Sequence, residues 1–384
     1  MDVDAVVELT RALVAVDTRN PPGNERAIVG VCRDALAPLR AAVTEVERAP
    51  GRVSLVAAGP HPGGEARRPT LLVNGHLDVV PIDRAAWVHD PFAAVLEDGR
   101  LYGRGTADMK GGIAAAIVAL QTLERAGRVP ACNVVFHLVA DEERGGALGT
   151  RVLLEQGLIT ADACLVPEPT SLQVCIAERG LMVVDVTIEG RPGHGSAPRE
   201  GVSAIEHAAA VVGAIHAADF GDPAHPLLGT PTANVGMIEG GSGHNTVAER
   251  CRLVVDRRLL PGATREDAVA ALRRRIDSAG VEGLRYTVDV TMFGEASEMD
   301  RDDPFVAEVS RAVQVATGRE PAVIGMSFTT DARFVRNQAG IPAVVCGPGD
   351  IDQAHVNDEW VSVERLVDAT AAYAELFASF GRSG

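Results

Sequence analysis

The stretch LLVNGHLDVVP, residues 71–81, decides the fold class of this chain, because it joins a short apolar strand to polar residues at the strand's end. Leu71–Val73 is apolar, and His76 and Asp78 follow within a few residues. In sheets of parallel strands, functional side chains lie just beyond the carboxyl ends of the strands. We therefore expect this stretch to be a buried strand that contributes to a functional site.

Two further apolar runs of strand length end in the same way. The run 134–139 is followed by Asp141, Glu142 and Glu143, and the run 163–166 is followed by Glu168. Residues 111–126 are rich in alanine, isoleucine and leucine, as a buried helix is. Apolar strands separated by helices predict an α/β fold, with a mostly parallel sheet that is covered by helices on both faces.

The pattern of side chains changes near residue 178, which indicates a second domain. Residues 181–188 alternate apolar and polar side chains, as a half-buried antiparallel strand does. The remaining expected helices are 3–15, 25–39, 202–218, 264–279, 304–317, 331–338 and 362–379, with strands at 253–259 and 341–345. We expect an α/β domain, residues 1–177 and 293–384, that is interrupted by an inserted α+β domain, residues 178–292. The Pro/Gly-rich stretch 59–69 is expected to be an exposed loop.

Composition narrows the class of protein. The 384 residues include 52 acidic and 36 basic side chains, a net charge of −16 that argues against nucleic acid as a partner. The longest apolar stretch, Ile113–Leu120, is far shorter than the roughly 20 residues that span a bilayer. The N-terminus is acidic, unlike a secretory signal, and the six cysteines show no CxxC pairing. These features predict a cytoplasmic protein with no membrane partner.

Side chains suited to metal binding gather at the expected strand ends. They are two histidines and four acidic residues: His76, Asp108, Glu142, Glu143, Glu168 and His355. Singly, each has an ordinary structural explanation, and Asp108 could simply cap the helix that follows it. Together they suit zinc, cobalt or manganese, and the surplus of carboxylates indicates a pair of ions. Asp78 is expected to orient His76, since a metal-bound imidazole normally donates its other N–H to a carboxylate.

These residues fall within a series of motifs that runs nearly the length of the chain. The motifs are DTRNPPGNE (17–25), GHLDVVP (75–81), GRGTADMKGG (103–112), ADEERGG (140–146), PEPT (167–170), GxxxHGSAP (190–198) and GPGDIDQAHVNDE (347–359). In this order and spacing the chain resembles the dinuclear-metal aminoacylase and carboxypeptidase family. That family includes acetylornithine deacetylase, succinyl-diaminopimelate desuccinylase, aminoacylase, carnosine dipeptidase and glutamate carboxypeptidase.

The resemblance implies a metal-dependent hydrolase that removes an N-acyl group, such as acetyl or succinyl, from an amino acid or a related amine. It implies two divalent ions, with zinc as the first choice and cobalt or manganese as alternatives. Asp108 would bridge the ions, His76 and Glu168 would complete the ligands of one, and Glu143 and His355 those of the other. Relatives also carry a cis peptide after the bridging aspartate, which here is the bond Asp108–Met109.

Further roles follow from the same resemblance. Glu142 would be the general base, taking a proton from the attacking water and passing it to the leaving nitrogen. His194 would reach the active site of the partner subunit in a homodimer, formed through residues 178–292, and hydrogen-bond the oxyanion there. Asn245 and Arg258 match positions that contact substrate. Residues 329–334, TTDARF, resemble the desuccinylase pattern Thr-Ser-Asp-Gly-Arg-Phe, which makes Arg333 a second anchor for a substrate carboxylate.

Two alternatives to a deacylase remain open at this point. A dipeptidase or carboxypeptidase on the same scaffold would cleave the same kind of bond, beside a residue that carries a carboxylate. A catalytically inactive relative could act as a binding protein, although such proteins usually lose a ligand or the base. Here all five ligand positions and Glu142 are present, which favours an enzyme.

Overall fold

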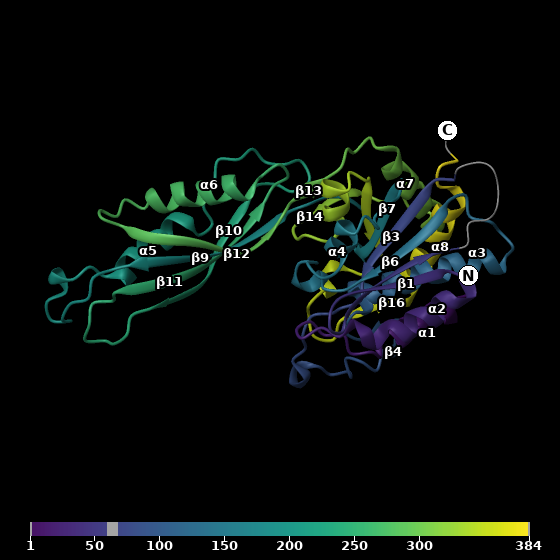
Figure 1. Cartoon of the computed structure of the whole chain (residues 1–384), viewed down its shortest axis with the longest axis horizontal. Coiled ribbons are helices and arrows are strands. Elements are labelled where there is room, and N and C mark those ends of the chain that lie inside the picture. The colour runs from purple at the N-terminus through teal and green to yellow at the C-terminus, as the bar shows by residue number, and fades with distance from the viewer. Residues whose placement is uncertain (1, 60–67, 383–384) are drawn as a thin grey trace. The chain divides into compact units, whose positions relative to one another are not determined.

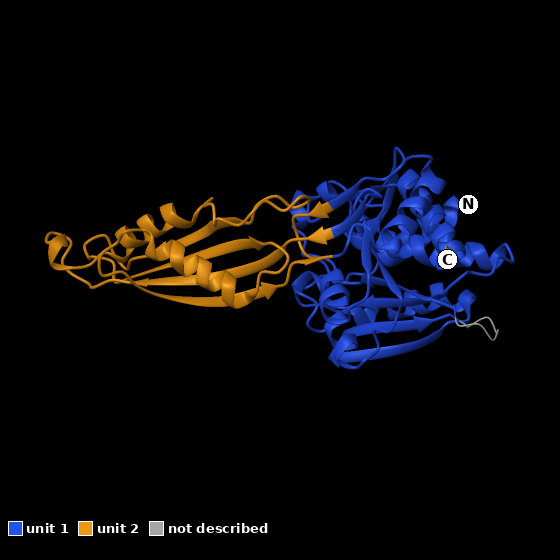
Figure 2. Cartoon of the chain, turned by 90° about the horizontal axis from the view of Figure 1, so that it is seen from above, with its two compact units in different colours: residues 1–176, 299–324, 330–384 blue, residues 177–298, 325–329 orange. Residues whose placement is uncertain are grey.

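The computed structural model describes residues 2–59 and 68–382, which form two compact units (Figures 1 and 2). The first unit comprises Met1–Ile176, Met299–Ile324 and Thr330–Gly384, and the second comprises Ala177–Glu298 and Gly325–Thr329. The loop expected at 59–69 falls largely outside the described residues. The chain therefore leaves the first unit near residue 176 and returns to it near residue 299.

The described residues form a nine-stranded sheet, most of which belongs to the first unit. Its path is β1(Ala42–Ala49), β2(Arg52–Ala58), β6(Asn133–Val139), β3(Thr70–His76), β7(Ala163–Pro169), β15(Ala343–Gly347), β8(Val174–Glu178) and β13(Ser297–Glu298), with β14(Val323–Met326) paired to β8. The four central strands, β6, β3, β7 and β15, are parallel to their neighbours within this group, whereas the flanking pairs are antiparallel. The expected mostly parallel centre is confirmed, and the antiparallel flanks add to it.

The register of the central strands brings their carboxyl ends together. Leu71 is paired with Val134 on one side and with Ala163 on the other, so β6, β3 and β7 start level. His76 at the end of β3 is paired with Val139 at the end of β6. The polar residues that follow these apolar strands therefore emerge side by side at one edge of the sheet.

Helices cover both faces of this sheet (Figure 1). The longer helices of the first unit are α1(Val3–Val14), α2(Val29–Leu36), α3(Gly111–Arg125), α4(Thr150–Glu155), α7(Pro304–Thr317) and α8(Val363–Ser379). The helix expected over 25–39 is divided into η1(Glu25–Ile28), α2 and η2(Ala37–Leu39), and that expected over 331–338 contains the π-helical turn η7(Phe334–Gln338). In the described residues, we find no helix that is long and apolar enough to cross a bilayer.

The first turn of α3 approaches the end of β7 closely. A Cβ atom at Gly112 would lie 2.2 Å from the carbonyl oxygen of Pro167, and one at Gly111 would lie 2.3 Å from that of Thr106. Only glycine fits at these two positions, since any side chain would collide with main-chain atoms. This contact holds the preceding turn, η4(Thr106–Lys110), against the carboxyl edge of the sheet.

The second unit has an antiparallel sheet with two helices on one face. The strands follow the order β10(Thr232–Gly240), β11(Arg250–Leu259), β9(Gly180–Glu189) and β12(Arg285–Gly294), and the helices are α5(Ala204–Ile215) and α6(Arg265–Asp277). Alternate residues of β9, including Val184 and Val186, pack with Val211 of α5 and Leu272 of α6 in a separate core. The alternation of 181–188 thus forms the antiparallel strand that was expected.

Candidate metal centre

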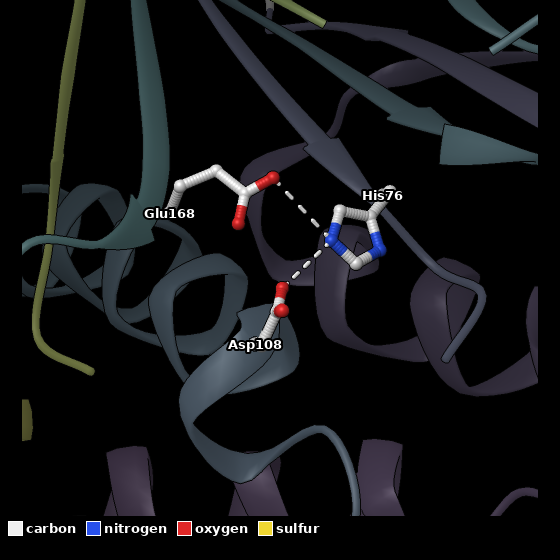
Figure 3. A group of neighbouring side chains, drawn as sticks. All are labelled: His76, Asp108 and Glu168. Atoms are coloured by element: carbon white, nitrogen blue, oxygen red, sulfur yellow. Dashed lines mark hydrogen bonds and ion pairs between the residues drawn. The ribbon is translucent and has the colours of Figure 1, made fainter. Parts of the chain in front are cut away.

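Three buried side chains converge at the carboxyl edge of the central sheet (Figure 3). His76 comes from the end of β3, Glu168 from β7 and Asp108 from η4. The Nε2 atom of His76 lies 3.0 Å from Oδ1 of Asp108 and 3.4 Å from Oε1 of Glu168. Each side chain offers one ligand atom, and these atoms lie within 4.8 Å of one another. This arrangement can hold one divalent ion.

A second group shares Asp108 with the first. The Nε2 atom of His355 lies 3.1 Å from Oε2 of Glu143 and 3.4 Å from Oδ2 of Asp108. Asp108 therefore directs one carboxylate oxygen to each group, which is the geometry that a bridging ligand needs. The peptide bond Asp108–Met109 is cis, as the resemblance implied.

The charges at this edge favour cations. Burial, together with the neighbouring carboxylate of Asp108, raises the pKa of Glu168 to about 8 and also raises the pKa of Glu143. Hydrogen bonds to Asp108 and Glu143 raise the pKa of His355 to about 11. Carboxylates this crowded and buried are costly without a compensating charge. The donor set of imidazole nitrogen and carboxylate oxygen therefore fits two divalent ions.

Glu142 lies beside both groups without belonging to either. It opens the turn η5(Glu142–Arg144), directly after β6. Burial raises its pKa well above the usual range, and the carboxylate of Glu168 acts in the same direction, whereas the charge of His76 opposes them. A carboxyl group with a raised pKa next to a metal site is suited to accept and return a proton.

Asp78 supports both His76 and the turn that carries Glu142. The Nδ1 atom of His76 lies 2.8 Å from the main-chain oxygen of Asp78 and 3.8 Å from its carboxylate, so the closer contact runs through the main chain. The carboxylate of Asp78 instead accepts the main-chain N–H groups of Glu142 and Glu143, at 3.2 and 3.3 Å. Asp78 thus links the strand end of β3 to that of β6.

A buried network behind Asp78 was not identified from the sequence. The side-chain amide of Asn20 donates to Asp78 and to Asp141, and Arg52 donates to Glu25 and to Asp141. Asn20 and Glu25 belong to the motif DTRNPPGNE, to which sequence analysis assigned no role. Polar residues in a motif next to prolines could have drawn attention to this segment.

Three expected functional residues lie in the second unit. His194 is exposed, with Nδ1 2.7 Å from Oγ of Ser196. The main-chain N–H of Gly195 donates to the oxygen of Asn245, so His194 and Asn245 lie on adjacent segments. Arg258 lies on β11, and its Nε donates to Asp256 at 3.0 Å. The structure thus brings His194 and Asn245 together.

Arg333 is the expected substrate anchor of the first unit. Its guanidinium is buried and donates to two main-chain oxygens, those of Thr330 at 2.7 Å and Gly145 at 2.8 Å. Gly145 directly follows the turn η5. The contacts of Arg333 therefore connect the TTDARF segment to the turn that carries Glu142.

Comparison with known proteins identifies the family. Residues 72–379 of this chain match the sequence pattern of the family described as "Peptidase family M20/M25/M40". The succinyl-diaminopimelate desuccinylase of Methylobacterium radiotolerans is 30% identical over 394 residues, covering 98% of this chain and 97% of the relative. The acetylornithine deacetylase of Proteus mirabilis is 31% identical over 399 residues, covering 97% and 96%.

Solved structures show the same fold. Human carnosine dipeptidase 1 has a TM-score of 0.78 at 19% identity, over 98% of this chain and 96% of that chain. Aminopeptidase PepT from Bacillus cereus has a TM-score of 0.81 at 23% identity, over 98% of both chains. The expected enzyme class and fold are confirmed, and this chain belongs to peptidase family M20/M25/M40, as a metal-dependent hydrolase.

Proposed function

We propose that this protein removes an N-acyl group from an amino acid or a related amine, using two divalent ions. The observation that carries the proposal is the position of Asp108, whose two carboxylate oxygens face two separate groups of ligands. The curated relatives named above, a desuccinylase and a deacetylase, match nearly the whole chain and support this reaction class.

In this proposal, His76 and Glu168 hold one ion, Glu143 and His355 hold the other, and Asp108 is shared. Zinc is the ion that we propose first, with cobalt or manganese as alternatives, because imidazole and carboxylate ligands suit all three. When bound, the ions would polarise the amide carbonyl and lower the pKa of a water shared between them.

We propose Glu142 as the general base. Its carboxylate takes one proton from the attacking water as the C–O bond forms, and it returns that proton to the nitrogen as the C–N bond breaks. A carboxylate beside the metal centre suits both halves of this task, because the group must accept a proton from the water and then donate it to the leaving nitrogen. Asp78 holds the main chain of Glu142 in place for this transfer.

We propose that Asn245 and Arg258 contact the rest of the substrate. The planar guanidinium of Arg258 suits a substrate carboxylate, which would compete with Asp256 for the same donors. Arg333 was expected as a second anchor, but two of its nitrogens donate to main-chain oxygens. We propose that Arg333 contributes by holding Gly145, next to the turn that carries Glu142.

We also propose a homodimer formed through the second unit. Ile205, Ala209 and Gly213 lie four residues apart on one face of α5 and are exposed. Ile238, on the neighbouring edge strand β10, is 54% exposed. An apolar helix face beside an unpaired strand edge is suited to pair with a second copy of itself. His194 would then serve the partner subunit's site.

A cytoplasmic location remains our proposal and rests on cysteine usage. All six cysteines are buried, which fits a protein that keeps its thiols reduced in the core.

A substrate screen tests the proposed reaction. The purified protein, with zinc, cobalt or manganese added, is assayed against N-acetyl, N-formyl and N-succinyl amino acids and against dipeptides. We expect turnover of one or more N-acyl amino acids, with dipeptides at least tenfold poorer in kcat/KM. Faster cleavage of dipeptides would establish the peptidase alternative, and no turnover of any compound with bound metal would favour a binding protein.

A further inference from the structure

We propose that Glu359 is a positioning residue for the metal centre, acting through the main chain that carries Asp108. Its fully buried carboxylate accepts four hydrogen bonds. Oε1 accepts from the main-chain N–H groups of Ala107 at 2.8 Å and Asp108 at 3.0 Å. Oε2 accepts from the N–H of Gly105 at 2.9 Å and from Nη1 of Arg104 at 2.6 Å. This inference rests on the proposed function, because it concerns the same site.

The segment held by Glu359 departs from helical geometry around Asp108, although it includes the turn η4. Gly105 has a φ of 89°, and Asp108 has φ −123° and ψ 95°, which are not helical values. Thr106 and Lys110 donate their main-chain N–H groups to Gly103 and Gly105, whereas the N–H groups of Gly105, Ala107 and Asp108 donate to Glu359. A buried N–H without an acceptor is costly. The carboxylate of Glu359 supplies that acceptor for the three main-chain N–H groups of Gly105, Ala107 and Asp108, and so fixes the position of the main chain at Asp108.

The same contacts reach the other end of the metal centre. Glu359 lies four residues after His355, and Nη2 of Arg104 donates to the oxygen of Val356 at 3.1 Å. The N–H of Gly103 donates to the oxygen of Glu359 at 2.8 Å. The pair Arg104 and Glu359 therefore ties the segment of one ligand, His355, to the segment of another, Asp108.

A short ladder of strands leads into this junction. β16(Trp360–Ser362) pairs with β5(Arg100–Tyr102), and Trp360 lies opposite Tyr102. The strand β16 begins directly after Glu359, whose main-chain oxygen accepts from Gly103. Its side chain accepts from the next main-chain N–H groups of the facing segment, those of Gly105, Ala107 and Asp108. His355 and Asp108, whose side chains lie 3.4 Å apart, thus depend on Glu359 for their spacing.

The substitution Glu359→Gln tests this inference with little change in shape. The amide nitrogen of glutamine cannot accept a hydrogen bond, so about half of the four donors lose their acceptor. Metal affinity is measured by competition with a chromophoric chelator, and metal content by mass spectrometry after dialysis at fixed free zinc. We expect the weaker-bound ion to lose about 10- to 100-fold in affinity, as is typical when a partner of a ligand is removed.

Kinetics and a control variant separate positioning from general damage. We expect kcat of Glu359→Gln to recover as zinc is raised, with KM for the substrate unchanged. Tyr373→Phe is the matched control, because it removes another buried hydrogen bond of the first unit, from Tyr373 Oη to the oxygen of Cys346 at 2.7 Å. This control should keep the metal affinity of the unaltered protein.

Wild-type metal affinity in folded Glu359→Gln would overturn the inference, and so would an equal loss in Tyr373→Phe. If Glu359→Gln does not fold, Arg104→Lys takes its place, since lysine keeps the charge but cannot reach both Glu359 and Val356. Unchanged affinity in folded Arg104→Lys would likewise count against it. Failure of the unaltered protein to hydrolyse any N-acyl amino acid would overturn only the proposed reaction, because the affinities are measured without substrate.

Discussion

The side-chain amide of Asn20 donates to the carboxylate of Asp78 at 2.9 Å, across 58 residues of sequence. The same amide donates to Asp141 at 3.1 Å, so one buried side chain holds two acidic groups together. Asp78 in turn holds the main chain of Glu142 and Glu143. The N-terminal segment thereby contributes to the position of the proposed base, although it supplies none of the proposed ligands.

Replacing Asn20 with alanine should lower stability. Asp78 and Asp141 would each lose a donor in a buried site, which typically costs about 1–3 kcal/mol in the free energy of unfolding. Urea denaturation of the metal-loaded protein measures this loss. The exposed Asn234 provides the control, and Asn234→Ala should unfold at the same urea concentration as the unaltered protein. Equal midpoints for both variants would contradict the structural role of Asn20.

The neighbours Glu142 and Glu143 should separate into a base and a ligand. Glu142→Gln keeps the shape of the side chain but cannot take a proton, so we expect kcat to fall by about 10²- to 10⁴-fold. Both ions should remain bound. Glu143→Ala removes a side chain within 3.1 Å of His355 and should first lose metal.

Metal content and kcat of the two variants, measured on the same preparations, check this assignment. Loss of metal in Glu142→Gln with full occupancy in Glu143→Ala would reverse the two roles.

Buried His137 should make stability depend on pH. It lies on β6, and neither ring nitrogen has a hydrogen-bond partner among the residues that the structure describes. Burial lowers its pKa to about 4 from a usual 6.5. Between these values the unfolded chain binds a proton that the folded chain does not, so stability falls as the pH drops from 6.5 towards 4. Above pH 6.5 the group has no effect. From pH 7 to pH 5, the loss is about 2 kcal/mol.

The variant His137→Leu checks this effect, because it cannot titrate. Urea denaturation at pH 7 and pH 5 should show a smaller loss for His137→Leu than for the unaltered protein. His244→Leu, at an exposed position, serves as the control and should keep the full loss. An identical pH response in all three proteins would exclude His137 as the source.

Mixed dimers should recover activity if His194 acts in the partner subunit. His194→Ala and Glu142→Ala are each expected to be inactive as pure proteins. In a mixed dimer, one of the two sites would combine an intact Glu142 with an intact His194 from the partner. Mixing the two variants should therefore restore part of the activity, as measured after subunit exchange.

The dimer contact can be tested separately. Ala209→Arg places a charge on the exposed apolar face of α5 and should yield a monomer in sedimentation experiments, with little activity. In the mixed-dimer experiment, if the His194→Ala and Glu142→Ala subunits exchange but no activity returns, His194 acts in its own chain's site or outside catalysis. A fully active monomer would exclude the trans arrangement.

The strands that carry the metal centre could be predicted from the sequence alone. The runs 71–73 and 163–166 are apolar throughout, and the run 134–139 is apolar except for the buried His137. Continuous apolar runs are typical of strands that are buried on both faces. Each ends in imidazole or carboxylate groups, and parallel register then brings those groups to one edge. The local sequence was sufficient to predict these strands, because a short apolar run indicates a buried strand and the residues that follow it lie at its carboxyl end.

The flanking strands were not predicted from the sequence and became evident only in the tertiary structure. β1 and β2, at the edge of the large sheet, were not expected, and neither were β10 and β12 of the second unit. Residues of β10 are largely exposed, so its hydrophobic pattern is weak. In β12, Tyr286, Val288 and Val290 alternate with polar residues, a pattern that could have indicated this strand. Edge strands of this kind are stabilised by main-chain pairing with a neighbour, which no single segment reveals.

The hydrogen-bond partners of the polar residues could not be predicted from the sequence, because they depend on the folded arrangement of distant segments. The sequence indicated that His76, Asp108 and Glu168 act together, because metal ligands are few in kind and recognisable by their chemistry. It did not indicate that Asp78 would hold the turn of Glu142, or that Arg333 would donate to Gly145. Any main-chain group can accept or donate a hydrogen bond, so these partners depend on which segments the folded chain places within 3 Å or so of one another.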